Sequence, residues 1–208
     1  MSTAAAKLDQ RVVRGEATRE LILDAAAEIL RGQGGAATTT RAVAERAGVR
    51  LSLVHYHFRG KGGLLAELLE RENTRLLERQ QGLYAGPEPL AEKWRTACGY
   101  LREDLRSGYA RVLWELWAAG LADEALARRW REAMAGWRAL LSDVAERWAA
   151  ERGLELPLRT TALVTLVMNA FQGAEVEILA GVTEAEAPHL EALESVAALI
   201  DWFERRAS

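Results

Sequence analysis

The sequence of 208 residues predicts an all-α protein. Ala, Leu, Glu and Arg dominate its composition, and all four residue types favour helices. Apolar residues recur at intervals of three and four, whereas no alternating β-branched run is long enough to predict a strand. The four prolines fall between the periodic stretches, at positions 87, 89, 157 and 188.

The first predicted element is a helix that follows a short arm. Residues 1–15 are polar and basic and lack the apolar segment of a signal peptide, so we expect a disordered basic arm there. From residue 16 onward, one helical face collects the apolar residues Ile22, Ala25, Ala26, Ile29 and Leu30. Gly34 lies just beyond the end of this helix.

Two short helices joined by a glycine turn are predicted over residues 39–58. Thr39 is a good N-cap for the first of them. Its small apolar face consists of Val43, Ala44 and Ala47. Gly48 lies where the chain leaves this helix, a place that suits a positive φ. In the second helix Val54 and Phe58 are one turn apart, and we expect both to face inward.

The outer side of the second helix differs from an ordinary solvated surface, since it carries Arg50, Leu51, Ser52, His55 and Tyr56. Hydroxyl groups can donate to phosphates, and apolar groups can contact thymine methyls. Residues 1–61 hold 10 Lys and Arg against 6 Asp and Glu, a net charge of +4, although the whole chain carries −3. These features predict a helix-turn-helix that places its second helix in a DNA groove.

The motif T-x-x-x-V-A-x-x-A-G-V, followed by H-Y-H-F-x-x-K-x-x-L, resembles the TetR (tetracycline repressor) family of bacterial regulators. The resemblance implies a three-helix DNA-binding domain over residues 16–77 and a larger helical effector-binding and dimerisation domain over residues 78–208. With Arg50 added from the exposed face, the expected DNA contacts are Thr39, Thr40, Arg41, Arg50, Leu51, Ser52, Leu53, His55, Tyr56, His57 and Lys61.

The sequence departs from the family pattern at two places. Arg50 stands where Ser usually caps the recognition helix, so the cap is lost or moves to Ser52. Gly62 and Gly63 follow Lys61 where Glu or Asp is usual, which weakens the first turn of the next helix. We therefore expect a recognition helix that is more mobile without DNA.

The second half of the chain is predicted to be helical throughout. A long fourth helix spans 63–81, a linker follows at 82–89, and further helices cover 90–106, 109–119, 123–152, 158–180 and 189–206. The last two helices are apolar around more than one face, which indicates burial on two sides. The resemblance implies a homodimer formed by these two helices, with Leu163, Val167, Leu193, Val196 and Ile200 in the interface.

All seven tryptophans lie beyond the predicted DNA-binding domain, where core packing is the ordinary explanation. Polar residues on the apolar helix 158–180 need partners, which can be protein, water or a ligand. By resemblance an effector would bind here, and the candidate pocket residues are Trp94, Trp114, Glu115, Trp117, Trp137, Met168, Phe171, Gln172 and Glu175. A cationic effector is expected if either glutamate faces the pocket.

Other classes of protein are poorly supported. No nucleophile elbow, phosphate-binding glycine loop or Cys/His metal spacing is present, so we expect no catalytic residue, no cofactor and no metal, and hence not an enzyme. The single cysteine, Cys98, is expected in the core. The most apolar stretch, residues 162–171, is too short to span a bilayer, so a cytoplasmic location is expected.

These observations together predict a dimeric, sequence-specific transcriptional regulator. The preferred hypothesis is a repressor that a small-molecule effector releases from a palindromic operator. An alternative stays open: a helical DNA-binding regulator without a small-molecule effector, controlled by a protein partner.

Overall fold

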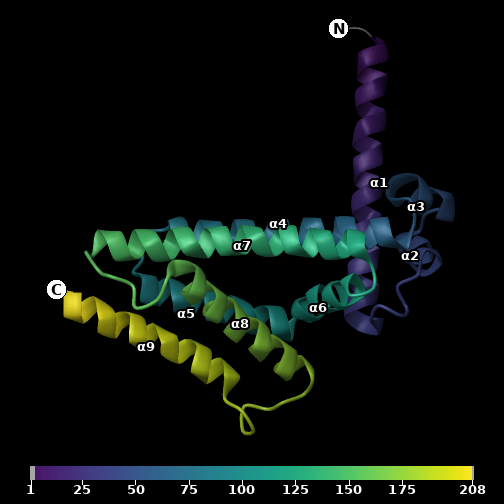
Figure 1. Ribbon diagram of the computed structural model, residues 1–208. Helices are drawn as coiled ribbons and strands as arrows, with labels where there is room; N and C mark the ends of the chain where they lie inside the picture. The colour runs from purple at the N-terminus through teal and green to yellow at the C-terminus, as the bar shows by residue number, and fades with distance from the viewer. Residues whose placement is uncertain (1–2, 208) are drawn as a thin grey trace. The chain divides into compact units, whose positions relative to one another are not determined.

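The computed structural model describes residues 3–207, and in this range its regular secondary structure is entirely α-helical (Figure 1). The prediction of an all-α fold is confirmed. The helices of the described chain are α1 (Thr3–Gln33), α2 (Thr40–Ala47), α3 (Leu51–Phe58), α4 (Lys61–Ala85), α5 (Leu90–Arg106), α6 (Tyr109–Gly120), α7 (Glu124–Glu151), α8 (Thr160–Leu179) and α9 (His189–Ala207). Helix α4 extends beyond the expected 63–81 at both ends, which shortens the expected linker.

The prediction of a disordered arm over residues 1–15 is wrong from residue 3 onward, because α1 begins at Thr3. Residues 1 and 2 lie outside the described chain. The physical reason is compositional: residues 3–14 contain three consecutive alanines and several other good helix formers, and proline is absent. A segment of this composition extends α1 toward the N-terminus, because the apolar face that begins at Ile22 already stabilises the rest of the helix.

The chain divides into two compact units. Unit 1 comprises the chain up to Glu72 together with Glu115–Trp130, and unit 2 comprises Asn73–Trp114 together with the chain from Arg131 onward. The division differs from the expected boundary at residue 77 in one important respect, since a segment from the middle of the chain belongs to the N-terminal unit.

The core of unit 1 is formed by the inward faces of its helices. Its fully buried apolar side chains include Ile22, Leu30, Val43, Val54, Phe58, Leu64 and Leu68, joined by Leu116 and Leu126 from the 115–130 segment. The two added leucines are 0% and 1% exposed. The segment 115–130 therefore contributes to the hydrophobic core of unit 1.

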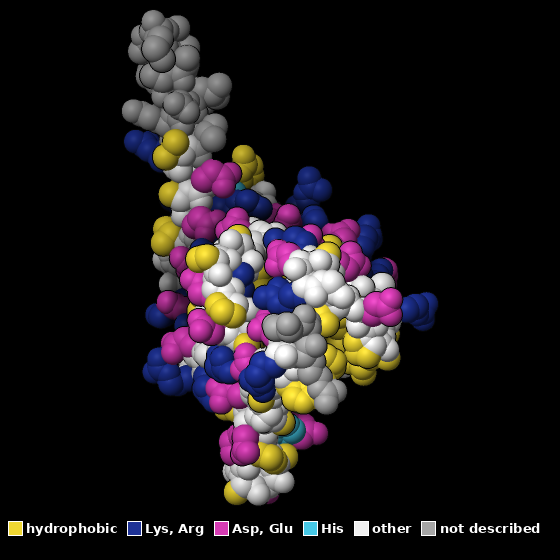
Figure 2. Space-filling model, turned by 90° about the vertical axis from the view of Figure 1, so that its left-hand side faces the viewer, with side chains coloured by type: hydrophobic (Ala, Val, Ile, Leu, Met, Phe, Trp, Pro, Cys, Tyr) yellow, Lys and Arg dark blue, Asp and Glu magenta, His cyan; other side chains and the backbone are white. Residues whose placement is uncertain are grey.

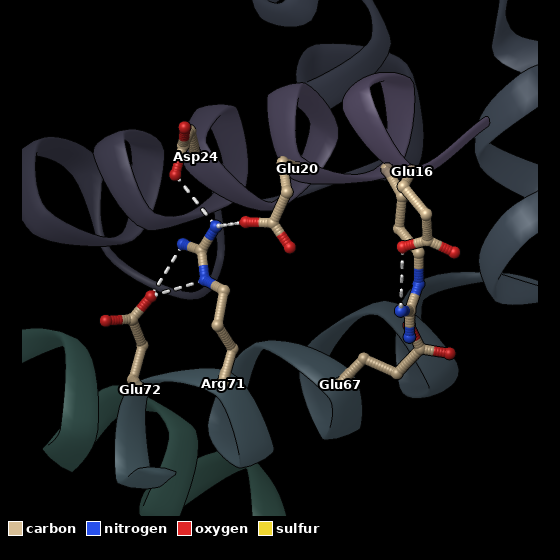
Figure 3. A network of polar contacts seen from close by, with 7 residues as sticks. Glu16, Glu20, Asp24, Glu67, Arg71 and Glu72 are labelled. Atoms are coloured by element: carbon tan, nitrogen blue, oxygen red, sulfur yellow. Dashed lines mark hydrogen bonds and ion pairs between the residues drawn. The ribbon is translucent and has the colours of Figure 1, made fainter. Parts of the chain in front are cut away.

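A charged network ties α1 to α4 within unit 1 (Figure 3). The Arg71 guanidinium lies 2.9 Å from a Glu20 carboxylate oxygen, 2.8 Å from Asp24 and 2.6 Å from Glu72. Burial alone would lower the pKa of Arg71, but the neighbouring Glu72 charge and the hydrogen bonds to these carboxylates outweigh it and raise that pKa. Arg19 and Glu67 form a second ion pair between the same helices.

Unit 2 is organised around α5 and α9, which lie side by side (Figure 1). The Trp94 indole nitrogen donates a hydrogen bond to the backbone oxygen of Leu193 at 2.6 Å, so the two helices share a polar contact inside an apolar cluster. The Phe171 ring of α8 packs edge-on against Trp94 with ring centres 5.4 Å apart. Cys98 is buried in this cluster, as expected.

Helix α8 lies within the expected range 158–180 and is slightly shorter than that range. Its 20 residues, Thr160–Leu179, have a mean hydropathy of 1.3 and are long and apolar enough to cross a membrane by length and composition. The expectation from the sequence concerned the shorter stretch 162–171 inside this helix, and the core helix of a soluble protein satisfies the same test. Only 11% of this helical window is buried within the chain.

Candidate nucleic-acid interface

The α2–turn–α3 motif forms for local reasons that the sequence already contains. The Thr39 hydroxyl accepts a hydrogen bond from the amide of Ala42 at 3.1 Å, which satisfies one of the free donors at the start of α2. Gly48 has φ +67° and ends α2 in the left-handed region. Its amide and that of Val49 bond back to carbonyls of α2, which fixes the direction in which α3 leaves.

Helix α3 has two sharply different faces. Val54 is 0% exposed and Phe58 is 2% exposed, so both anchor the helix in unit 1 as expected. The opposite face projects outward, and Tyr56 is 78% exposed. Arg50, Leu51, Ser52, Leu53 and His55 are also exposed, and His57 is half-buried. The α3 outer face therefore offers hydroxyl, imidazole and apolar groups to a partner.

The ends of α3 are unusual. Arg50 occupies the N-cap position without a side-chain hydrogen bond, so the usual cap is lost, as expected, and Ser52 lies inside the helix. Arg59 ends the helix with φ +58°, the one residue other than glycine with positive φ in the described chain. An exposed arginine thus occupies a backbone conformation that costs a side-chain-bearing residue about 1 kcal/mol or more.

The basic residues of the motif take part in contacts within the chain. The Arg41 guanidinium pairs with Glu45 at 3.1 Å, and both side chains are largely exposed. Lys61 donates from its Nζ to the backbone oxygen of Gly35 at 2.8 Å. Such exposed contacts contribute little to stability, so these cations can exchange them for phosphates at small cost.

The glycine pair at the start of α4 has a steric explanation. A Cβ at Gly63 would lie 2.0 Å from the backbone oxygen of Phe58, a distance that no side chain can adopt. A Cβ at Gly62 would lie 3.0 Å from the carboxylate of Asp123. The departure from the family pattern therefore reflects close packing where α3 ends and α4 begins.

Comparison with known proteins agrees with this geometry. Residues 22–68 match the protein family described as "Bacterial regulatory proteins, tetR family". The chain carries a TetR-family domain. The matched range contains both helices of the motif and ends within α4. The search of curated proteins gives no match.

Solved structures resemble most of the chain. A TetR transcription regulator from Haloarcula marismortui is 22% identical with a TM-score of 0.70, covering 89% of this chain and 96% of that one. FadR from Bacillus subtilis, solved with stearoyl-CoA, is 17% identical with a TM-score of 0.71, covering 87% and 96%. A regulator from Saccharomonospora viridis, solved with choline, is 17% identical with a TM-score of 0.71, covering 88% and 94%. The fold is that of these TetR-family regulators.

The expected pocket residues separate into two groups. Glu115 and Trp117 belong to unit 1, and the other seven belong to unit 2. Within unit 2, Trp94 packs on Phe171, and the Trp114 indole nitrogen donates to Glu175 at 2.9 Å. In the same group, the Trp137 indole nitrogen donates to Asn73 at 2.9 Å and the Gln172 amide nitrogen donates to the sulfur of Met134 at 3.3 Å.

Glu175 is the most strongly perturbed carboxyl of this group. Burial raises the pKa of Glu175 to about 7, the hydrogen bond from Trp114 opposes this effect, and the nearby charge of Asp104 adds to it. The carboxylate of Glu115, in contrast, accepts a hydrogen bond from the backbone amide of Gly35 at 2.9 Å. The structure therefore draws Trp114 and Glu115, neighbours in sequence, into different units.

The expected interface residues on α8 and α9 face their own core to a greater extent than expected. Leu193 is 6% exposed within the α5–α9 cluster, and Val167, Val196 and Ile200 pack against the same cluster. The prediction for Leu193 is corrected on this ground, because a side chain buried within the chain cannot contact a partner. The exposed large apolar residues of these helices are Leu166, Val176, Leu179, Leu199, Trp202 and Phe203.

Sequence reasoning did not find two features of this region: the contact between Glu115 and Gly35, and the approach of Asp123 to Gly62. The partners are 80 residues apart in the first case, so no local pattern reveals them. Glycines at 34, 35, 62 and 63 were the available signal, since each lies where a side chain would meet another group.

Proposed function

We propose that this protein is a homodimeric transcriptional repressor that binds a palindromic operator and is released from it by a small-molecule effector. The observation that carries the proposal is the outward face of α3, where Tyr56 is 78% exposed while Val54 and Phe58 anchor the helix from behind. A helix anchored in this way presents its outer side chains to a partner, as a major-groove reader must.

The expected DNA contacts are compatible with this role. Leu51, Ser52, Leu53, His55 and Tyr56 supply the base-edge and phosphate contacts of α3, with Arg50 and His57 at its flanks. Thr39, Thr40, Arg41 and Lys61 supply contacts to phosphates. The first 61 residues carry a net charge of +4, which favours a polyanionic partner in spite of an isoelectric point near 5.8.

Dimer formation is supported by the uncovered apolar surface of α8 and α9. Leu166 is 58% exposed and Leu199 is 59% exposed, and Trp202 and Phe203 lie beside each other near the end of α9. Figure 2 shows charged side chains interspersed over one face of the molecule, with hydrophobic side chains gathered at one side of it. A twofold pair would place two α3 helices about 34–36 Å apart, one turn of DNA.

An effector site in unit 2 is supported by its aromatic and polar groups. Trp94 and Phe171 stack edge-on, and Trp114 donates to the partly buried carboxylate of Glu175. A carboxylate beside indole rings favours a cation, and one similar structure was solved with choline. Another was solved with stearoyl-CoA, so the fold accommodates different ligands. A cytoplasmic location and the absence of enzymatic activity follow from the same proposal.

The test is selection of duplex DNA from a randomised pool by the full chain, followed by gel shift at several salt concentrations. We expect an enriched palindrome and an affinity that falls with salt. Arg41→Ala or Lys61→Ala should each weaken binding about 10-fold and lower the salt slope by about one, with unchanged helical content. Failure to enrich any duplex at low salt would refute the proposal.

The role of an effector is tested separately with the enriched duplex. Addition of single compounds, beginning with quaternary amines and acyl-CoA esters, should release the complex if a small molecule controls it. A protein that binds the duplex but responds to no compound in the panel would favour control by a protein partner instead.

A further inference from the structure

The turn between α1 and α2 is held by side chains from other parts of unit 1. The Gly35 amide donates to Glu115 Oε2 at 2.9 Å, and the Gly35 carbonyl oxygen accepts from Lys61 Nζ at 2.8 Å. The buried hydroxyl of Thr38 donates to the carbonyl oxygen of Gly34 at 3.0 Å. The backbone amide and the carbonyl oxygen of Gly35 both form hydrogen bonds with side chains immediately before the helix-turn-helix.

Glycine at position 35 is explained by the space around its Cα and not by its backbone conformation. Gly34 has φ +79°, which by itself favours glycine, but Gly35 has no positive φ. A Cβ at Gly35 would lie 3.0 Å from Glu115 Oε2, the same oxygen that accepts its hydrogen bond. Glycine at this position leaves the space that the Glu115 carboxylate occupies.

A second carboxylate from the same segment lies at the other flank of the motif. Asp123 follows α6, and its Oδ1 accepts from the amides of Ala125 and Leu126 at 2.9 and 3.1 Å, which caps α7. Its Oδ2 lies 3.0 Å from the point where Gly62 would carry a Cβ. Asp123 therefore lies beside the first turn of α4, where the helix dipole favours a negative charge.

We propose that Glu115 and Asp123 form an acidic bracket that positions the helix-turn-helix for operator binding. The proposal rests on the DNA-binding function proposed above. Neither carboxylate suits a phosphate contact, because like charges repel, so both act as positioning residues through the neutral backbone. The bracket holds the chain where it enters α2 and where it enters α4, and the orientation of α3 depends on both points.

The test compares Glu115→Ala, Glu115→Gln and the control Glu155→Ala, which removes an exposed glutamate far along the chain. All three use the full chain and the duplex that the wild type enriches. We expect about 10-fold weaker binding for Glu115→Ala and recovery to within about twofold for Glu115→Gln, whose amide oxygen still accepts from Gly35. Affinity for Glu155→Ala should not change.

A double-mutant cycle with Gly35→Ala distinguishes positioning from general destabilisation. The added methyl group should weaken DNA binding when Glu115 is present and cause little further loss in the Glu115→Ala background. Gly62→Ala should weaken binding in the same way, and this loss should shrink beside Asp123→Ser, whose shorter side chain leaves room for the added methyl group and can still cap α7. Additive losses in both cycles, or wild-type affinity for Glu115→Ala, would overturn the bracket.

Hydrogen exchange gives a readout that needs no DNA. We expect the amides of residues 33–39 to exchange at least 10-fold faster in Glu115→Ala than in the wild type, with Glu115→Gln close to the wild type. Unchanged exchange would overturn the proposal. If the wild type enriches no duplex but this difference is present, the DNA-binding function fails while the contact at Gly35 stands.

Discussion

Arg59 shows how one residue can combine a backbone cost with a functional position. Its φ of +58° places it in the left-handed region at the end of α3, where glycine would be preferred. Because this arginine lies beside the exposed face of α3, we expect its side chain to serve DNA binding and not stability. The expected need is a phosphate contact.

Arg59→Gly should therefore separate stability from binding. We expect the free energy of unfolding to rise by about 1 kcal/mol, since the strained conformation is relieved, while DNA affinity falls about 10-fold. Thermal unfolding and gel shift measure the two effects, and Arg59→Lys, which keeps both charge and strain, is the control. A glycine variant that binds DNA as tightly as the wild type would remove Arg59 from the interface.

Glu175 makes stability depend on pH. Because burial raises the pKa of Glu175 from 4.5 to about 7, the folded state holds its proton more tightly than the unfolded state does. The resulting stabilisation is complete below pH 4.5 and is lost as the pH rises through 7. The Gln side chain in Glu175→Gln cannot ionise. Between pH 4.5 and 7, the free energy of unfolding of this variant should therefore change less than that of the wild type, by about 1–3 kcal/mol.

Urea titrations at pH 5 and pH 8 measure this difference. Glu78→Gln, which changes an exposed glutamate on α4, is the matched control and should follow the wild type. An equal pH dependence in wild type and Glu175→Gln would show that this carboxyl titrates in its ordinary range.

At the scale of elements, the α2–turn–α3 motif is the part that the sequence predicts best. Thr39, Gly48, Val54 and Phe58 each act on neighbours within one or two helical turns, so spacing alone specifies their roles. The bounds of α5 were also predicted to the residue, because Pro89 and the apolar period mark its start. The length of α1 was not, since no local signal marks where a helix of good formers begins.

Helix α4 offers a clean comparison of two glycines. Gly63→Ala places a methyl group 2.0 Å from the Phe58 carbonyl oxygen, whereas Gly82→Ala on the same helix meets nothing within 4 Å. We expect Gly63→Ala to destabilise the protein by about 3 kcal/mol or more and to abolish DNA binding. Gly82→Ala should stabilise it by about 0.5–1 kcal/mol. Circular dichroism melts and gel shift check both, and a tolerated Gly63→Ala would contradict the tight junction between α3 and α4.

At the scale of the whole molecule, the exposed apolar residues of α8 and α9 provide the test of dimer formation. Val167 packs against the chain's own core, whereas Leu166 and Leu199 are exposed, so Leu166→Glu and Leu199→Glu are suitable probes. We expect each to weaken dimerisation about 100-fold with unchanged helical content, because a carboxylate would be buried without a partner. Sedimentation measures the mass, Leu158→Glu outside these helices is the control, and a dimer retained in both variants would place the interface elsewhere.

The division into units is the feature that sequence reasoning could least anticipate. Hydrophobic periodicity identifies α6 and α7 but does not say with which partners their residues pack. The assignment depends on Leu116, Leu126 and the carboxylate of Glu115 meeting groups far away along the chain. The same limit explains why the expected pocket residues fall in two units while the outer face of α3 stays together.

Because unit 1 consists of two separate segments of the chain, it limits which fragments of this protein can fold. A fragment that ends at Glu72 would expose the apolar surface that Leu116 and Leu126 cover and would leave the Gly35 amide without its acceptor. A fusion protein that contains unit 1 must therefore include residues 115–130 as well. We expect the segment up to Glu72 to be insoluble or unfolded when it is fused to another protein without them.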